Sequence, residues 1–176
     1  MASMVDTRVR NCAEIGENLI RIIDALMHNK TLIKLLYNET MNPLEDANID
    51  NLTHEQYEDF LTKEIYEKLI KIVPRIGPKE NAKSIVALQV TEATKLLDNS
   101  EFRNVEVVVS VFVPTTQWLI KGRHLRPFAI LGEVQSVLDG LVVNGLGQMN
   151  GGGFKVNFLT DEMTCYEQFY NIIAYD

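Results

Sequence analysis

The sequence predicts an α+β protein in which a small mixed or antiparallel sheet packs against helices, with a helical segment at the N-terminus. Two observations predict this class. Apolar residues recur at steps of three and four along residues 1–73, as on one face of a helix. Strand-like runs then dominate residues 84–176, where one further helical stretch separates two pairs of strands. We therefore expect a single domain, 1–176, with a mainly helical part and a strand-strand-helix-strand-strand part.

The N-terminal part begins with helical spacing over residues 13–37, interrupted at residues 28–31. This interruption predicts a kink followed by a shorter helix, with Thr31 as a candidate cap. Asn42-Pro43 ends the pattern, because a residue before proline is disfavoured in the α conformation. Residues 43–52 are polar and predict a loop.

A second helical stretch follows that loop. Thr53-His-Glu-Gln56 matches a capping box, in which the side chains of the first and fourth residues bond each other's backbone N–H groups. Apolar residues then continue at helical spacing, so we expect an amphipathic helix that runs to Ile72 and ends before Pro74. Residues 74–83 predict a loop broken by Gly77-Pro78.

The strands are predicted from residue alternation. Residues 85–91 predict a strand, and residues 98–100 predict a turn. Residues 104–114 give the clearest strand, because valines occupy every second position on one face. Those valines are Val105, Val107, Val109, Val111 and Val113.

A helix is predicted from Arg126-Pro127, because proline is favoured at the first helical position. Phe128 is a core candidate on this helix, and Gly140 lies near its end. The glycine-rich residues 145–153 predict a flexible turn or a loop that becomes ordered on assembly. Two last strands are expected at residues 154–159 and 167–174.

Composition limits the classes of partner. The formal net charge of −7 argues against non-specific binding of nucleic acid, which requires many lysines and arginines. The longest apolar runs are too short for a bilayer span, so we expect no membrane contact. Cys12 and Cys165 lie far apart in the sequence and form no metal-binding or redox motif. These features favour a protein made in the cytoplasm.

The sequence offers little catalytic chemistry. The glycines of residues 145–153 follow a helix and lead into a strand, whereas phosphate-binding glycines precede a helix. The three histidines (His28, His54 and His124) have no metal-ligand spacing. The serines and cysteines lack a nucleophile motif, although a scattered triad leaves no local signature. We therefore expect no cofactor, no metal and no enzymatic activity.

Trp118 and the basic residues that follow it form the most informative cluster. Lys121, Arg123 and Arg126 are its basic members. A single aromatic residue is a poor platform for nucleobases, since a binding groove needs several along a basic track. Tryptophan and arginine are favoured anchors in protein interfaces, so we interpret the cluster as a candidate subunit interface. Gly151, Gly152 and Gly153 complete the predicted interface residues.

The whole pattern resembles the neck and tail-completion proteins of tailed bacteriophages, a group that includes tail terminators and head–tail joining proteins. The resemblance covers most of the chain and is diffuse. It is carried by residues 19–24 (Leu-Ile-Arg-Ile-Ile-Asp), residues 29–38, the Ile-Val-Pro74 break, Trp118 at the end of a strand, Leu125-Arg-Pro127 with Gly132, and Asn144-Gly-Leu-Gly147.

The resemblance implies a virion structural protein that is assembled in the host bacterial cytoplasm. Its partners would be copies of itself in a ring, most often a hexamer, together with tail-tube and head-side connector proteins. DNA would pass through the ring without being held, because an acidic lining repels it. Two alternatives stay open from the residues alone: a cytoplasmic adaptor or binding module that dimerises through its sheet, and an enzyme with dispersed site residues.

Overall fold

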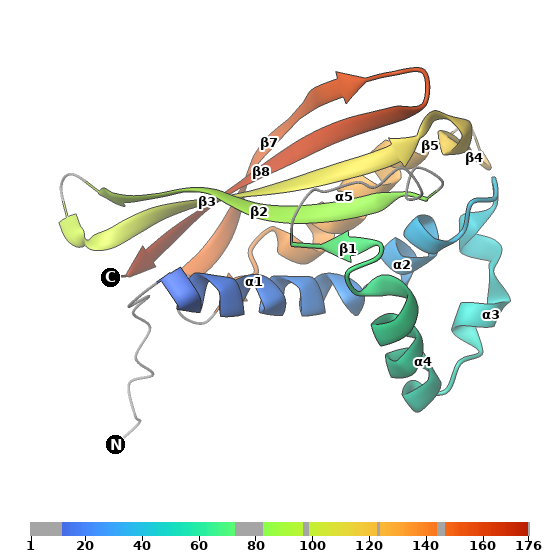
Figure 1. The fold of residues 1–176 in the computed structure, drawn as a ribbon, viewed down its shortest axis with the longest axis horizontal. Helices are drawn as coiled ribbons and strands as arrows, with labels where there is room; N and C mark the ends of the chain where they lie inside the picture. Colours follow the sequence, from blue (N-terminus) through green and yellow to red (C-terminus); the bar gives the residue numbers. More distant parts are fainter. Residues whose placement is uncertain (1–11, 73–82, 97–98, 123, 144–146, 176) are drawn as a thin grey trace.

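The structure, a computed structural model, describes residues 12–72, 83–96, 99–122, 124–143 and 147–175. It confirms the α+β class. The main sheet has six strands, mostly antiparallel and strongly twisted (Figure 1). In spatial order these are β1 (Ile70–Lys71), β2 (Ile85–Leu96), β3 (Asn99–Pro114), β8 (Met163–Tyr175), β7 (Gly147–Leu159) and β6 (Val142–Val143). A second sheet pairs β4 (Leu119–Ile120) with β5 (His124–Leu125).

Three helices form a layer against the main sheet: α1 (Cys12–Met27), α2 (Lys30–Tyr37) and α5 (Arg126–Leu138). α1 contacts β1 and β2, whereas α5 contacts β3 and β7, and α2 packs on both helices. Figure 1 shows α1 below the sheet and the short helices α3 (Ala47–Asp50) and α4 (His54–Phe60) at one end. Buried residues from the helices and the sheet form one core cluster between these layers.

The predicted interruption of the first helix is confirmed, but its cap is a different residue. The Asn29 side-chain oxygen accepts a hydrogen bond from the Leu32 backbone N–H at 3.0 Å, so the second helix begins two residues earlier than a cap at Thr31 would allow. The prediction of a loop over residues 43–52 is wrong in part. A 3-10 turn, Pro43–Glu45, and α3 lie within it.

The predicted capping box is confirmed. The Gln56 backbone N–H donates to Thr53 Oγ1 at 3.3 Å, and the Thr53 backbone N–H donates to Gln56 Oε1 at 3.0 Å. The predicted extent of the helix to Ile72 is wrong. The helix continues as one π-helical turn, Leu61–Ile65, and ends before Glu67, whose φ of 58° is left-handed.

The chain then enters the sheet as β1, parallel to β2. The Val86 backbone N–H donates to the Leu69 carbonyl oxygen at 2.8 Å. Leu69 and Ile70 are buried here, as they would be on a helix, and for this reason the apolar spacing did not separate the two structures. The loop predicted after Ile72 lies almost wholly outside the described residues.

β2 and β3 are longer than predicted and form a hairpin. Asn99 and Ser100 belong to β3, so the turn predicted at residues 98–100 is wrong for these two positions. The predicted valine face is confirmed, because all five of its valines are buried. Val108 and Phe112, on the opposite face, are buried as well.

The two last strands are also longer than predicted. β8 lies in the middle of the sheet, where it pairs with β3 along its whole length and with β7 on its other side. β6 pairs only with Gly147 and Gln148 of β7. Among the described residues, the rest of β7 pairs with β8 alone, so its other edge has no strand partner.

Candidate assembly interface

Arg126 begins α5 and lies in the interior of the chain. Its exposed surface is 0%, and each of its nitrogen atoms is a donor to a backbone carbonyl. Nε donates to the Gln117 carbonyl oxygen at 2.8 Å, and Nη1 donates to that of Leu35 at 2.8 Å. Nη1 also bonds the Asn38 carbonyl, and Nη2 bonds that of Thr40.

Leu35 and Asn38 lie at the C-terminal end of α2, where helix carbonyls lack partners within the helix. The guanidinium therefore joins the end of α2 to the segment that follows β3. Burial lowers the pKa of Arg126, and the charge of Glu39 partly opposes this effect. Arg126 was predicted as a surface contact, but the structure places it inside the fold, where another subunit has no access to it.

Trp118 is half-buried against the core. Its indole N–H donates to Thr164 Oγ1 at 2.9 Å, and this hydroxyl donates to the Val113 carbonyl oxygen at 3.2 Å. Trp118 therefore fixes the segment after β3 onto β8. Its role as a subunit anchor stays a prediction.

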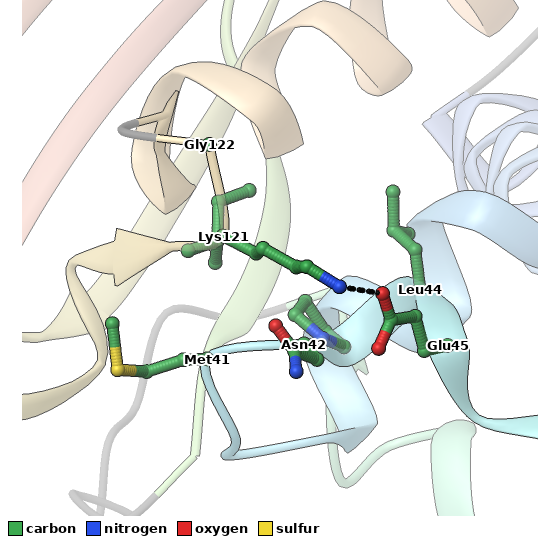
Figure 2. A pocket seen from close by; sticks show the side chains of 8 residues that line it. Met41, Asn42, Leu44, Glu45, Lys121 and Gly122 are labelled. Carbon is green, nitrogen blue, oxygen red and sulfur yellow. Dashed lines mark hydrogen bonds and ion pairs between the residues drawn. The ribbon is translucent and has the colours of Figure 1, made fainter.

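Lys121 lies in the tight turn between β4 and β5 and is exposed. Its backbone N–H donates to the Met41 carbonyl oxygen at 2.7 Å, which joins this turn to the segment after α2. Its Nζ forms an ion pair with Glu45. Figure 2 shows this side chain extended from the turn to Glu45 on the opposite side. Arg123, from the same predicted cluster, lies outside the described residues.

These two segments enclose a hollow of about 230 Å³, which we call the loop groove. It is lined by Met41, Asn42, Pro43, Leu44, Glu45, Ile120, Lys121 and Gly122 (Figure 2). Met41 and Leu44 are exposed at the groove, and Leu119 is exposed on the neighbouring strand β4. The loop groove is therefore an apolar depression crossed by one ion pair.

The three predicted interface glycines lie in strand β7, so the prediction of a flexible loop is wrong for residues 147–153. Residues 144–146 lie outside the described residues. The pairing of β7 with β8 shifts register between Gly151 and Phe154, which is a bulge. Gly153 has a φ of 99°, a conformation that favours glycine. The Gly151 backbone N–H donates to Asp139 Oδ1 at 3.1 Å.

Beyond this bulge, β7 and the first turn of α5 share an exposed apolar surface. We call Phe128, Phe154 and Val156 the edge patch. The ring centroids of Phe128 and Phe154 are 5.8 Å apart, and the buried Tyr166 lies 5.3 Å from Phe128 and 6.4 Å from Phe154. Phe128, predicted as a core residue, is 42% exposed. Sequence reasoning missed this patch, although Phe154 and Val156 stand at alternate positions of a predicted strand.

Other groups with chemical potential are dispersed. Cys165 is buried and forms no disulfide within the described part of the chain, and burial raises the pKa of its thiol to about 12, which suppresses the reactive thiolate. Within the described ranges, no group of three or more His, Cys, Asp or Glu side chains could hold a metal ion. None of the helices in those ranges is long and apolar enough to cross a membrane.

The fold and the site define an α+β protein with one twisted sheet and two separate exposed apolar surfaces. The chain belongs to the YomW family, whose sequence model matches residues 29–172. The family name is phage-derived, and the protein is accordingly phage-associated. No curated protein matches the chain.

Proposed function

We propose that the chain is a structural subunit of a tailed-phage particle, without catalytic activity, that forms a ring with copies of itself at the head–tail junction. The phage-derived family supports the phage context of this proposal. The resemblance to tail terminators and head–tail joining proteins supports the position. The partners would be tail-tube and head-side connector proteins.

The observation that carries the proposal is the presence of two different exposed apolar surfaces on one chain. The edge patch lies on β7 and the start of α5, whereas the loop groove lies between the segment after α2 and the β4–β5 turn. Identical subunits that join through two different surfaces make head-to-tail contacts, and such contacts generate rings when the rotation closes. Apolar clusters of this kind mark interaction sites on soluble proteins.

The net charge of −7 fits a ring that DNA crosses without binding. Virion assembly would take place in the host bacterial cytoplasm, and the assembled protein would then be part of the virion. A hexamer is the expected ring size by resemblance.

One observation favours a second candidate, a cytoplasmic adaptor that dimerises through its sheet. The edge of β7 beyond Met149 has no strand partner among the described residues, and free edges pair readily with another strand. Pairing of two β7 edges would give a two-fold dimer.

A phage that carries a stop codon in the gene for this chain tests the proposal. We expect lysates with filled heads and tails that are not joined, visible by negative-stain electron microscopy, and recovery of whole particles when the chain is supplied from a plasmid. Mass spectrometry of purified wild-type particles should detect the chain. Infectious, intact particles from the stop-codon phage would refute the structural role. Absence of the chain from wild-type particles would favour the adaptor.

A further inference from the structure

We infer that the edge patch of one copy inserts into the loop groove of a second copy, with Phe154 as the inserted side chain. This contact rests on the proposed ring, because it is the head-to-tail contact that such a ring needs. It assigns a partner surface to both apolar regions.

The distribution of exposed apolar side chains supports this pairing. Eight large apolar side chains in the described part of the chain are exposed, with 42–66% of their surface accessible. Five of them gather in two places: Phe128, Phe154 and Val156 at the edge patch, and Met41 and Leu44 at the loop groove. Scattered apolar residues are normal on a surface, whereas clusters indicate contact with a partner.

The two surfaces have complementary forms. Phe154 is 55% exposed, so its ring is accessible to another molecule. The loop groove offers about 230 Å³ of apolar space. An apolar cavity of about 150 Å³ is enough to hold benzene, so the groove can accept one phenyl ring.

Both surfaces are held in place before contact. The wall of the groove that follows α2 is fixed by the bonds from Arg126 to the Asn38 and Thr40 carbonyls, and by the Lys121–Met41 backbone bond. Phe154 is positioned by its ring contacts with Phe128 and Tyr166. Pre-organised surfaces lose less conformational entropy on binding, which favours association.

The described ion pairs leave the edge patch uncharged. At the groove, Lys121 is paired with Glu45. Lys155 and Glu167, paired at 3.3 Å, project from the face of β7 and β8 opposite Phe154 and Tyr166, so they are not part of the edge patch.

Two single variants of the full chain test the contact: Phe154→Asp in the edge patch and Leu44→Asp in the loop groove. Analytical ultracentrifugation should show oligomers for the wild type and monomers for each variant alone. An equimolar mixture should form a one-to-one heterodimer and nothing larger, because one intact patch and one intact groove remain. Val142→Asp, an equally exposed position outside both surfaces, is the matched control and should assemble like the wild type.

Circular dichroism and urea unfolding must show that each variant is folded, and the exposed positions make this the expected result. Oligomers that persist in both variants would overturn the inference and leave the proposed ring standing. Monomeric variants that form no heterodimer when mixed would also overturn it, since patch and groove would then belong to different contacts. A monomeric wild type at high concentration would overturn self-association through these surfaces. The stop-codon phage tests the role in the particle independently.

Discussion

Replacing Arg126 by methionine tests how much of the fold depends on one buried cation. Methionine has a similar length and fills the same space, but it donates no hydrogen bond. The substitution would leave the carbonyls of Leu35, Asn38, Thr40 and Gln117 without their common donor. The end of α2 and the segment after β3 would then lose their connection.

The magnitude follows from two opposing effects. Hydrogen bonds from a charged group contribute about 1.5–3 kcal/mol each, but burying the charge costs several kcal/mol that methionine avoids. We therefore expect a net loss of about 2–4 kcal/mol in the free energy of unfolding, less than the sum of the bonds. Domains have stabilities of only about 5–15 kcal/mol, and this loss would lower the melting temperature by about 5–15 °C.

Urea denaturation followed by the fluorescence of Trp118, the single tryptophan, measures this change, with circular dichroism as a second probe. Arg126→Lys should recover little of the loss, because an ammonium group lacks the planar fork that reaches several carbonyls. Lys63→Met removes an exposed cation paired with Asp59 and should change stability by less than about 0.5 kcal/mol. An Arg126→Met midpoint equal to that of Lys63→Met would refute the reasoning.

Three further outcomes are expected from the same unfolding assay. Gly153→Ala should destabilise the chain by about 1–2 kcal/mol, because its φ of 99° is unfavourable for other residues. Gly151→Ala should be nearly neutral, since an added methyl group would meet only ordinary contacts, and an equal loss in both variants would contradict the backbone argument. Tyr170→Phe should leave stability unchanged or raise it by about 1 kcal/mol, because the buried hydroxyl has no hydrogen-bond partner among the described residues; a clear loss would indicate a hidden partner. Burial, and secondarily the charge of Glu58, raises the pKa of Tyr57 from 10.0 to about 12. The folded state thus holds this proton more tightly, and the resulting stabilisation is complete below pH 10 and is lost as the pH rises to about 12. Across this pH interval, the free energy of unfolding should fall less steeply with pH for Tyr57→Phe than for the wild type. Parallel pH curves for the two proteins would argue against Tyr57 as a source of the pH dependence.

Local signals predicted the fold class well. The capping box at Thr53 and the valine alternation of β3 depend on residues close together in the sequence, and both are confirmed. The start of α5 at Arg126 is also confirmed, because Pro127 occupies a favoured position of the first turn. Signals of this kind need no knowledge of the tertiary partner.

The features that depend on residues distant in the sequence were harder to predict from the sequence. Arginine is rarely buried, so nothing local indicated that carbonyls from α2 converge on Arg126. Glycines favour loops in general, whereas Gly151–153 lie in a bulged strand fixed by β8 and Asp139. The exposure of Phe128 could not be foreseen either, since an apolar residue on a helix is usually buried. These positions are now the ones to test.

The place of β8 has a consequence for how the chain is made. β8 is synthesised after β2, β3 and β7, yet it lies between β3 and β7. Phe102 pairs with Tyr175 and Pro114 with Met163, so the central pairing joins residues far apart in the sequence. Such non-local pairing slows folding. A nascent chain that has not yet released β8 from the ribosome holds a divided sheet, and the edge patch, which packs on Tyr166 of β8, can reach its final form only after β8 has been made.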